Sequence, residues 1–357
     1  MKVKNHLFGM MAAVLLGSLL FATACTGPEV KDPSSEPGSQ AESQTAETSS
    51  ESNEEFTMEP IVLPEKTYTV GGDSEYQSLS ALLLSLKDDK EPKVIYLNAG
   101  TYDIYREYRD LRMETPPDDI KSSDYLDRCV FLPMNTYLIG LGDVTLSWNP
   151  SPEEITLGEA RTWSPLNVRY ACYVENITIY CKYGRYCIHD DSHNDVDDRG
   201  VKHIYKDVRC VYDFSADKKG FNNTIGFGFS QKSEYIFENC EFVMQNCPPG
   251  DVNHSAFYGH AASGDSLDPE ESPIIRIENC KIVGDRGNDR TVRFQSLNTC
   301  MLHAKAYIRN TKIVGGLYLT LYKEGAIQAF EVFLENSGDP LLKLDQSGSN
   351  PYPVKKN

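Results

Sequence analysis

The residues best suited to chemistry lie together in the stretch YCIHDDSHNDVDD, residues 186–198, which holds two histidines and five aspartates. A histidine can act as a general base, and paired carboxylates can do general acid and base work. We therefore predict catalytic roles for three adjacent residues, His189, Asp190 and Asp191. Three further carboxylates could bind Ca²⁺ through oxygen ligands, although their spacing is not that of a calcium loop: Asp195, Asp197 and Asp198. The alternative is a solvated acidic loop without function.

Three other segments carry residues that could face a substrate. A long insertion, residues 246–273, contains Tyr258, which we predict to bind substrate, and His260, which we predict to act in catalysis. The alternative is a surface turn with exposed histidines and no function. Arg290 and Arg293 follow it, and we predict that Arg290 binds substrate and that Arg293 acts in catalysis, unless both only pack on the surface. Arg106 and Arg109 could clamp the carboxylates of an acidic glycan, or form local ion pairs on a short helix.

Six segments share a repeated pattern that must position these residues. Each reads apolar, polar, Asn or Asp, small or apolar, polar, apolar, and the third places are 33, 31, 32, 40 and 31 residues apart. These third places are Asp143, Asn176, Asp207, Asn239, Asn279 and Asn310. A period near 30 residues indicates stacked repeats, and alternation on both sides of the Asn indicates two short strands that meet at a corner.

Asn and Asp suit such a corner because they tolerate left-handed backbone angles, and stacked amides could hydrogen-bond between coils. Two continuous apolar columns are then expected. The first is Leu141, Val174, Tyr205, Phe237, Ile277 and Ile308; the second is Leu146, Ile179, Cys210, Phe242, Ile282 and Ile313. Cys240 and Cys280 hold the same repeat position, so they should stack, either as free thiols or as a disulfide. The sequence therefore predicts an all-β fold, a single-stranded parallel β-helix.

The segment from Tyr68 to Tyr102 ends in a strand and a Gly-Thr-Tyr turn. It resembles the opening of right-handed β-helices of the pectin lyase-like superfamily, particularly pectinesterases. The resemblance implies an N-terminal capping helix with Leu79, Leu82, Leu83 and Leu86 on its buried face, and a first strand at Val94–Leu97. The catalytic motifs of pectinesterases, polygalacturonases and pectate lyases are absent, so no catalytic set is carried over.

The first residues combine Lys2 and Lys4 with an apolar run and small residues before Cys25, which is typical of a secretory signal. FATAC resembles a bacterial lipobox and implies lipidation of Cys25; simple secretion is the alternative. We predict a signal peptide at 1–24, a disordered Ser/Glu/Pro/Thr-rich tether at 25–66, the β-helix domain at 67–340 and a C-terminal tail at 341–357. The protein would then be extracellular and held at the bacterial membrane only through this lipid.

A formal net charge of −17 argues against nucleic acid as a partner. We predict a monomer that acts on acidic, uronate-type polysaccharide by lyase, esterase or hydrolase chemistry, with Ca²⁺ as the one cofactor considered. A noncatalytic glycan-binding or adhesin-like module is the alternative. Convergence of His189, Asp190 and His260 in one groove would favour the enzyme, whereas a row of tyrosines would favour the binding module.

Overall fold

The structure is a computed structural model in which the chain divides into two units, Met1–Glu59 and Pro60–Asn357. It describes residues 56–114, 130–154, 164–190, 200–215, 224–247, 254–263, 268–285, 290–295, 303–320, 331–344 and 354–356. The expected signal peptide, Cys25 and most of the expected tether lie outside these ranges. Within them, no helix has the length and apolar character needed to cross a bilayer.

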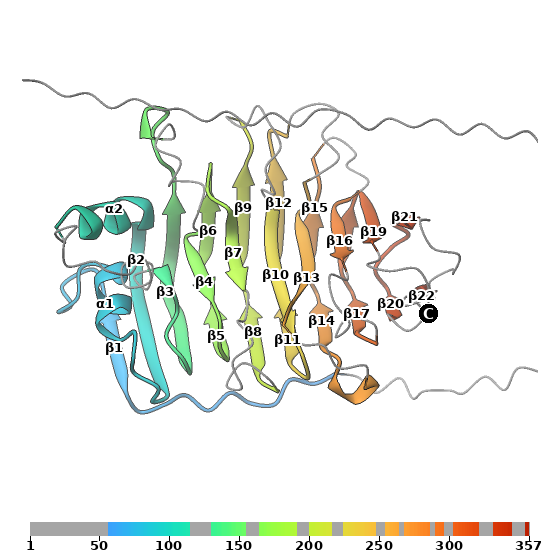
Figure 1. Cartoon of the computed structure of the whole chain (residues 1–357), viewed down its shortest axis with the longest axis horizontal. Coiled ribbons are helices and arrows are strands. Elements are labelled where there is room, and N and C mark those ends of the chain that lie inside the picture. The colour runs from blue at the N-terminus through green and yellow to red at the C-terminus, as the bar shows by residue number, and fades with distance from the viewer. Residues whose placement is uncertain are drawn as a thin grey trace, which may run out of the picture. The chain divides into compact units, whose positions relative to one another are not determined.

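The second unit is a parallel β-helix, as the sequence predicts, with its strands stacked coil upon coil in two sheets (Figure 1). The large sheet contains β1 (Thr67–Val70), β2 (Lys93–Asp103), β3 (Thr136–Trp148), β5 (Cys172–Glu175), β6 (Thr178–Cys181), β8 (Lys202–Lys206), β9 (Arg209–Asp213), β11 (Glu234–Glu238), β12 (Glu241–Gln245), β14 (Ile274–Glu278), β15 (Lys281–Val283), β17 (Lys305–Arg309), β18 (Lys312–Val314), β20 (Glu331–Glu335) and β22 (Val354–Lys356).

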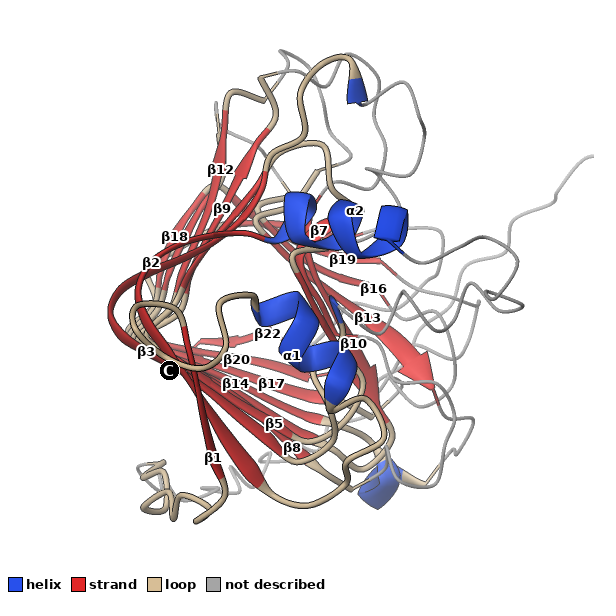
Figure 2. Ribbon diagram, turned by 90° about the vertical axis from the view of Figure 1, so that its left-hand side faces the viewer, coloured by secondary structure: helices blue, strands red, loops and turns tan. Residues whose placement is uncertain are grey.

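The small sheet contains β4 (Leu166–Val168), β7 (Tyr186–Asp190), β10 (Thr224–Ser230), β13 (Phe257–Ser263), β16 (Val292–Gln295), β19 (Gly316–Thr320) and β21 (Leu341–Leu344). Viewed along the axis of the β-helix, the large sheet bends into two arms and the small sheet closes the open side (Figure 2). The side chains that point inward from both sheets form one core. Strands β21 and β22 continue the two sheets beyond residue 340.

Left-handed backbone angles at the corner confirm the role of the repeated Asn and Asp. The φ angle is 55° at Asn176, 53° at Asp207 and Asn239, 55° at Asn279 and 46° at Asn310. Asn336, also at 46°, adds a corner that the sequence pattern did not include. The side-chain ladder is present where Asn336 Nδ2 donates to Asn310 Oδ1 at 3.2 Å.

The first corner departs from the prediction. Here Gly142, with φ of 95°, takes the left-handed angle in place of Asp143, and Leu141 is 47% exposed. Val174 pairs with Leu138, so Leu138 begins the first apolar column and the placement of Leu141 in it was wrong. The cause is that β3 has three residues more than the next coil at this corner, since Leu138 pairs with Val174 but Thr145 pairs with Thr178. The second column pairs as predicted.

The capping helix α1 (Leu79–Ser85) covers the first coil (Figure 2). Ser78 caps it by accepting a hydrogen bond from the Ala81 amide at 3.2 Å, and the four predicted leucines are buried. A second helix, α2 (Ile104–Glu114), follows β2. Its Glu107 carboxylate accepts hydrogen bonds from the Ser80 amide and the Ser78 hydroxyl at 2.8 and 2.9 Å. These bonds fix the N-terminus of α1 to α2.

Cys240 and Cys280 stack in consecutive coils as expected, and both are free thiols. The Cys240 amide donates to the Cys280 sulfur at 3.3 Å, and each thiol donates to backbone carbonyls. All seven cysteines in the described ranges are free and buried. Thiols at these positions therefore act as small core residues that also satisfy backbone groups at the corner.

Substitutions of Asn239 test how much the left-handed backbone angle at the corner contributes to stability. Asn239→Ala should lower the free energy of unfolding by about 1–2 kcal/mol, because alanine is strained at the left-handed angle. Asn239→Gly should lower it much less, since glycine adopts that angle freely. Chemical denaturation of both variants measures the difference. An equal loss in both would show that the asparagine side chain, rather than the backbone angle, stabilises the corner.

Glu278, which precedes the corner residue Asn279, makes the free energy of unfolding depend on pH. Burial raises the pKa of its carboxyl to about 7 and outweighs the attraction of the Arg309 guanidinium at 3.9 Å. Between the ordinary value of 4.5 and about 7, the folded protein holds a proton that the unfolded chain has lost, so stability falls as pH rises through this window.

Glu278→Gln removes this titration. Relative to the wild type, the variant should gain up to roughly 3 kcal/mol in free energy of unfolding between pH 4.5 and pH 8, since each pKa unit corresponds to about 1.36 kcal/mol. Denaturation at several pH values measures the gain, with the exposed Glu59 changed to Gln as a control. A difference that stays constant with pH would contradict the assignment.

Candidate functional site

The acidic stretch begins in β7 of the small sheet, where a bulge decides which side chains face outward. Tyr186 pairs with Thr224, but His189 pairs with Gly226, so β7 has one residue more than β10 over this interval. Tyr186 and His189 consequently lie on the same outer side, with ring centroids 5.0 Å apart. Gly226 makes room for them, because a Cβ there would lie 2.8 Å from the Tyr186 ring.

Asp190 faces the opposite way, into the core, and is fully buried. Its Oδ2 lies 2.9 Å from His203 Nδ1 and accepts a hydrogen bond from the Tyr205 hydroxyl at 2.6 Å. Asp190 and His189 therefore do not converge on one substrate. Asp191, Asp195, Asp197 and Asp198, including the expected Ca²⁺ ligands, lie outside the described residues.

The outward residues of successive strands align in one row across the small sheet. Strand pairing places His189, Gly226, Tyr258, Arg293 and Tyr318 opposite one another from β7 to β19. Their neighbours along the chain face inward to the core, as Phe257, Phe294 and Leu319 show. Adjacent strands are about 4.8 Å apart, so the row presents one side chain per coil along the axis of the β-helix.

Arginines and tyrosines interleave along this row. The Arg293 guanidinium lies 5.1 Å from the centre of the Tyr258 ring and 5.8 Å from that of Tyr318. Arg290 lies over the same Tyr318 ring at 4.4 Å. We call Tyr258, Arg290, Arg293 and Tyr318 the tyrosine–arginine row. Such cation–π contacts fix the guanidinium planes, and a positioned guanidinium can bind a carboxylate through two hydrogen bonds.

His260 extends the row on β13. It lies two residues after Tyr258 on the same side of the strand, pairs with Gln295, and its ring centroid is 5.1 Å from that of Tyr258. Burial raises the pKa of the Tyr258 phenol to about 12, so this phenol stays neutral and can serve as a donor or stacking surface. His260 lies on β13, which pairs with β16, the strand that carries Arg293.

Arg106 and Arg109 lie elsewhere, in a pocket of about 400 Å³. It is lined by α2, by the segment after β3 and by the turn after β6, including Lys182 and Tyr183. Arg109 pairs with Glu154 and with Asp110, so the ion-pair interpretation applies to it. The structure thus brings together His260, Tyr258, Arg290 and Arg293 on one face, with His189 at its edge, and places the two α2 arginines apart from them.

Two residues of this face were not singled out as site residues from the sequence. Tyr186 reaches it only because β7 is bulged, which the sequence does not reveal. Tyr318 is 6% exposed and lies against both arginines. The alternation in VRFQ and LYLT, where one polar or aromatic residue separates core residues, was the signal that could have paired Arg293 with Tyr318.

The comparisons with known proteins find similarity to solved structures. No family model and no curated protein matches it. Among solved structures it is similar to the pectin methylesterase of Aspergillus niger, at 15% identity over 83% of this chain and 93% of that one, with a TM-score of 0.36.

The carrot pectin methylesterase gives 10% identity over 84% and 90% of the two chains, with a TM-score of 0.38. A pectin methylesterase in complex with a hexasaccharide gives 10% identity over 81% and 92%, with a TM-score of 0.34. At these values no catalytic residue carries over to this chain.

Proposed function

We propose that the protein binds acidic, uronate-type polysaccharide along the outer face of the small sheet and removes ester groups from it. The observation that carries this proposal is the tyrosine–arginine row, in which Arg293 lies between two tyrosine rings. Aromatic rings offer apolar faces for sugar rings, and guanidinium groups pair with carboxylates. Because the chain as a whole is strongly acidic, attraction of a polyanion must come from such a local site.

The reaction assigned to this face is ester hydrolysis. His260 would take a proton from a water molecule as that water attacks the ester carbonyl, and the Arg293 guanidinium would stabilise the oxyanion that forms. Collapse of this intermediate breaks the bond to the alcohol, which leaves with the proton held by His260. The carboxylate or acyl acid is then released. This scheme uses only residues that the row brings together.

A noncatalytic glycan-binding module is the second candidate, and a specific observation favours it. Asp190 points into the core, so His189, Asp190 and His260 do not form one catalytic group, whereas the tyrosines do form a row. We also retain, as part of the proposal, secretion and attachment to the outer side of a bacterial membrane through a lipid on Cys25. In either case the partner is a polysaccharide.

Mass spectrometry of soluble products decides between these candidates. The full chain would be incubated with acidic polysaccharides that carry methyl or acetyl esters, with and without Ca²⁺. Loss of methyl or acetyl groups is expected, and His260→Gln should abolish it while leaving binding in place. Fragments lacking water would indicate elimination, and fragments with added water would indicate hydrolysis of the chain. Binding without any product would overturn the esterase proposal in favour of the binding module.

A further inference from the structure

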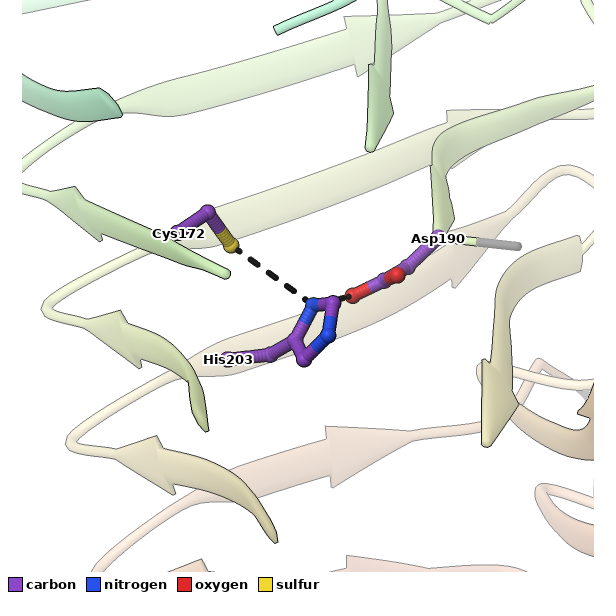
Figure 3. Close-up of side chains that lie close together, drawn as sticks. All are labelled: Cys172, Asp190 and His203. Carbon is purple, nitrogen blue, oxygen red and sulfur yellow. Dashed lines mark hydrogen bonds and ion pairs between the residues drawn. The ribbon is translucent and has the colours of Figure 1, made fainter. Parts of the chain in front are cut away.

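A second group of reactive side chains lies inside the β-helix, away from the tyrosine–arginine row. Cys172 on β5, Asp190 on β7 and His203 on β8 point toward one another from three strands of both sheets (Figure 3). Asp190 and His203 are 0% exposed at their side chains, and Cys172 is 6% exposed. Their donor atoms all lie within 4.8 Å of one another.

The geometry of these contacts is that of a ligand set. His203 directs a single ring nitrogen, Nδ1, at both partners: Asp190 Oδ2 lies 2.9 Å away and Cys172 Sγ 3.9 Å away. The Tyr205 hydroxyl donates to Asp190 Oδ2 at 2.6 Å and also adjoins the Cys172 thiol. Sulfur, nitrogen and two oxygens therefore converge on one point.

A nucleophilic triad would be arranged differently. There the cysteine and the carboxylate contact opposite nitrogens of the imidazole, so that a proton can pass from one side to the other. Here His203 Nε2 contacts neither, and it has no hydrogen-bond partner within the described part of the chain. Asp190 Oδ1 is likewise buried without a partner there. The cluster is therefore not arranged as a nucleophilic triad.

The spacing fits a tetrahedral ion. Zinc bonds of about 2.0–2.3 Å separate neighbouring ligand atoms by roughly 3.5 Å, so the nitrogen–oxygen distance would open by about 0.5 Å and the nitrogen–sulfur distance would close slightly. The imidazole is held in place for this role. The Tyr235 ring stacks on His203 at 4.4 Å, and the Tyr235 hydroxyl accepts from the Ser230 amide at 2.9 Å.

We propose that Cys172, Asp190 and His203 bind a zinc-class divalent metal ion, with the Tyr205 oxygen near the fourth position. Thiolate, imidazole and carboxylate together are ligands that zinc accepts, whereas calcium prefers oxygen alone. The ion joins β5 and β8 of the large sheet to β7 of the small sheet across consecutive coils. Its role is structural, because the site is enclosed and lies on the inner side of the strand that carries His189.

Cobalt(II) is the probe, since its spectrum reports both tetrahedral geometry and thiolate ligation. The full chain, stripped of metal and kept reduced, would be titrated with Co²⁺ and then with Zn²⁺. We expect one equivalent of Co²⁺ to bind with a thiolate-to-metal charge-transfer band, and Zn²⁺ to displace it. Zn²⁺ should also raise the midpoint of thermal unfolding.

Cys172→Ser should lose the charge-transfer band and at least tenfold in Co²⁺ affinity. Cys280→Ser is the matched control: it removes another buried thiol of the large sheet and should keep both the band and the affinity. If Cys172→Ser does not fold, X-ray absorption on the zinc-loaded wild type replaces it. One sulfur at about 2.3 Å with nitrogen and oxygen near 2.0–2.1 Å supports the site, and ligation without sulfur overturns it.

Binding of less than one tenth of an equivalent of Co²⁺ by the wild type would also overturn the proposal. The same holds if Cys280→Ser loses the band while Cys172→Ser retains it. These outcomes are independent of polysaccharide processing, which is measured at the outer face of the small sheet.

Discussion

Arg293→Gln should weaken binding of a uronate polymer by ten- to a hundredfold, which corresponds to about 1.4–2.8 kcal/mol. The glutamine keeps a polar side chain, although a shorter one, and removes the charge and the fork of donors that hold a carboxylate. It also removes the cation that lies over Tyr258 and Tyr318. Titration calorimetry against a de-esterified polyuronate measures the loss, and the wild-type affinity should fall with added salt.

The large sheet provides a matched control for Arg293. Arg276 on β14 likewise lies over a tyrosine ring, 5.0 Å from that of Tyr307, but it belongs to the large sheet and pairs with Glu234 at 2.8 Å. Arg276→Gln should therefore leave polysaccharide affinity within twofold of the wild type. Equal losses in the two variants would indicate a general charge effect, and unchanged affinity in Arg293→Gln would remove the tyrosine–arginine row as the binding face.

Gly140→Ala should destabilise the domain by about 3 kcal/mol, at the upper end of the range for overpacking. A Cβ at this position in β3 would lie 2.1 Å from the carbonyl oxygen of Asn176 in the next coil. The obstacle is backbone, and Asn176 Nδ2 also donates to the Gly140 carbonyl at 2.8 Å, so neither coil can shift freely. Denaturant unfolding followed by circular dichroism measures the change.

Gly338→Ala separates this clash from the general effect of replacing a glycine. Gly338 has φ of 74° and nothing within 4 Å of an added Cβ, so alanine there meets only backbone strain. Its cost should be about 1 kcal/mol. If Gly140→Ala cost no more than Gly338→Ala, the close approach of the first two corners would not limit the packing of the coils.

The sequence by itself determined the coil architecture, because stacking depends on a local pattern repeated at a nearly constant period. Five of the six repeated Asn or Asp positions mark a left-handed corner, and the flanking alternation marks which side chains face the core, as Val174 and Ile179 show on either side of Asn176. The capping helix was expected from the resemblance of the segment from Tyr68 to Tyr102 to β-helix openings, and its four leucines are buried. Where β3 has three residues more than the next coil, the local pattern gave the wrong register, and Leu141 was wrongly placed in the core.

Only the tertiary structure decided which reactive residues share a face. Residues from different coils meet through strand register, and one bulge in β7 sets Tyr186 and His189 outside while Asp190 turns inward to His203 and Cys172. In the sequence Asp190 is an ordinary member of an acidic stretch. Its partners lie 18 residues before it and 13 after it, on strands that become neighbours only when the coils close, so no spacing along the chain could have revealed the buried cluster.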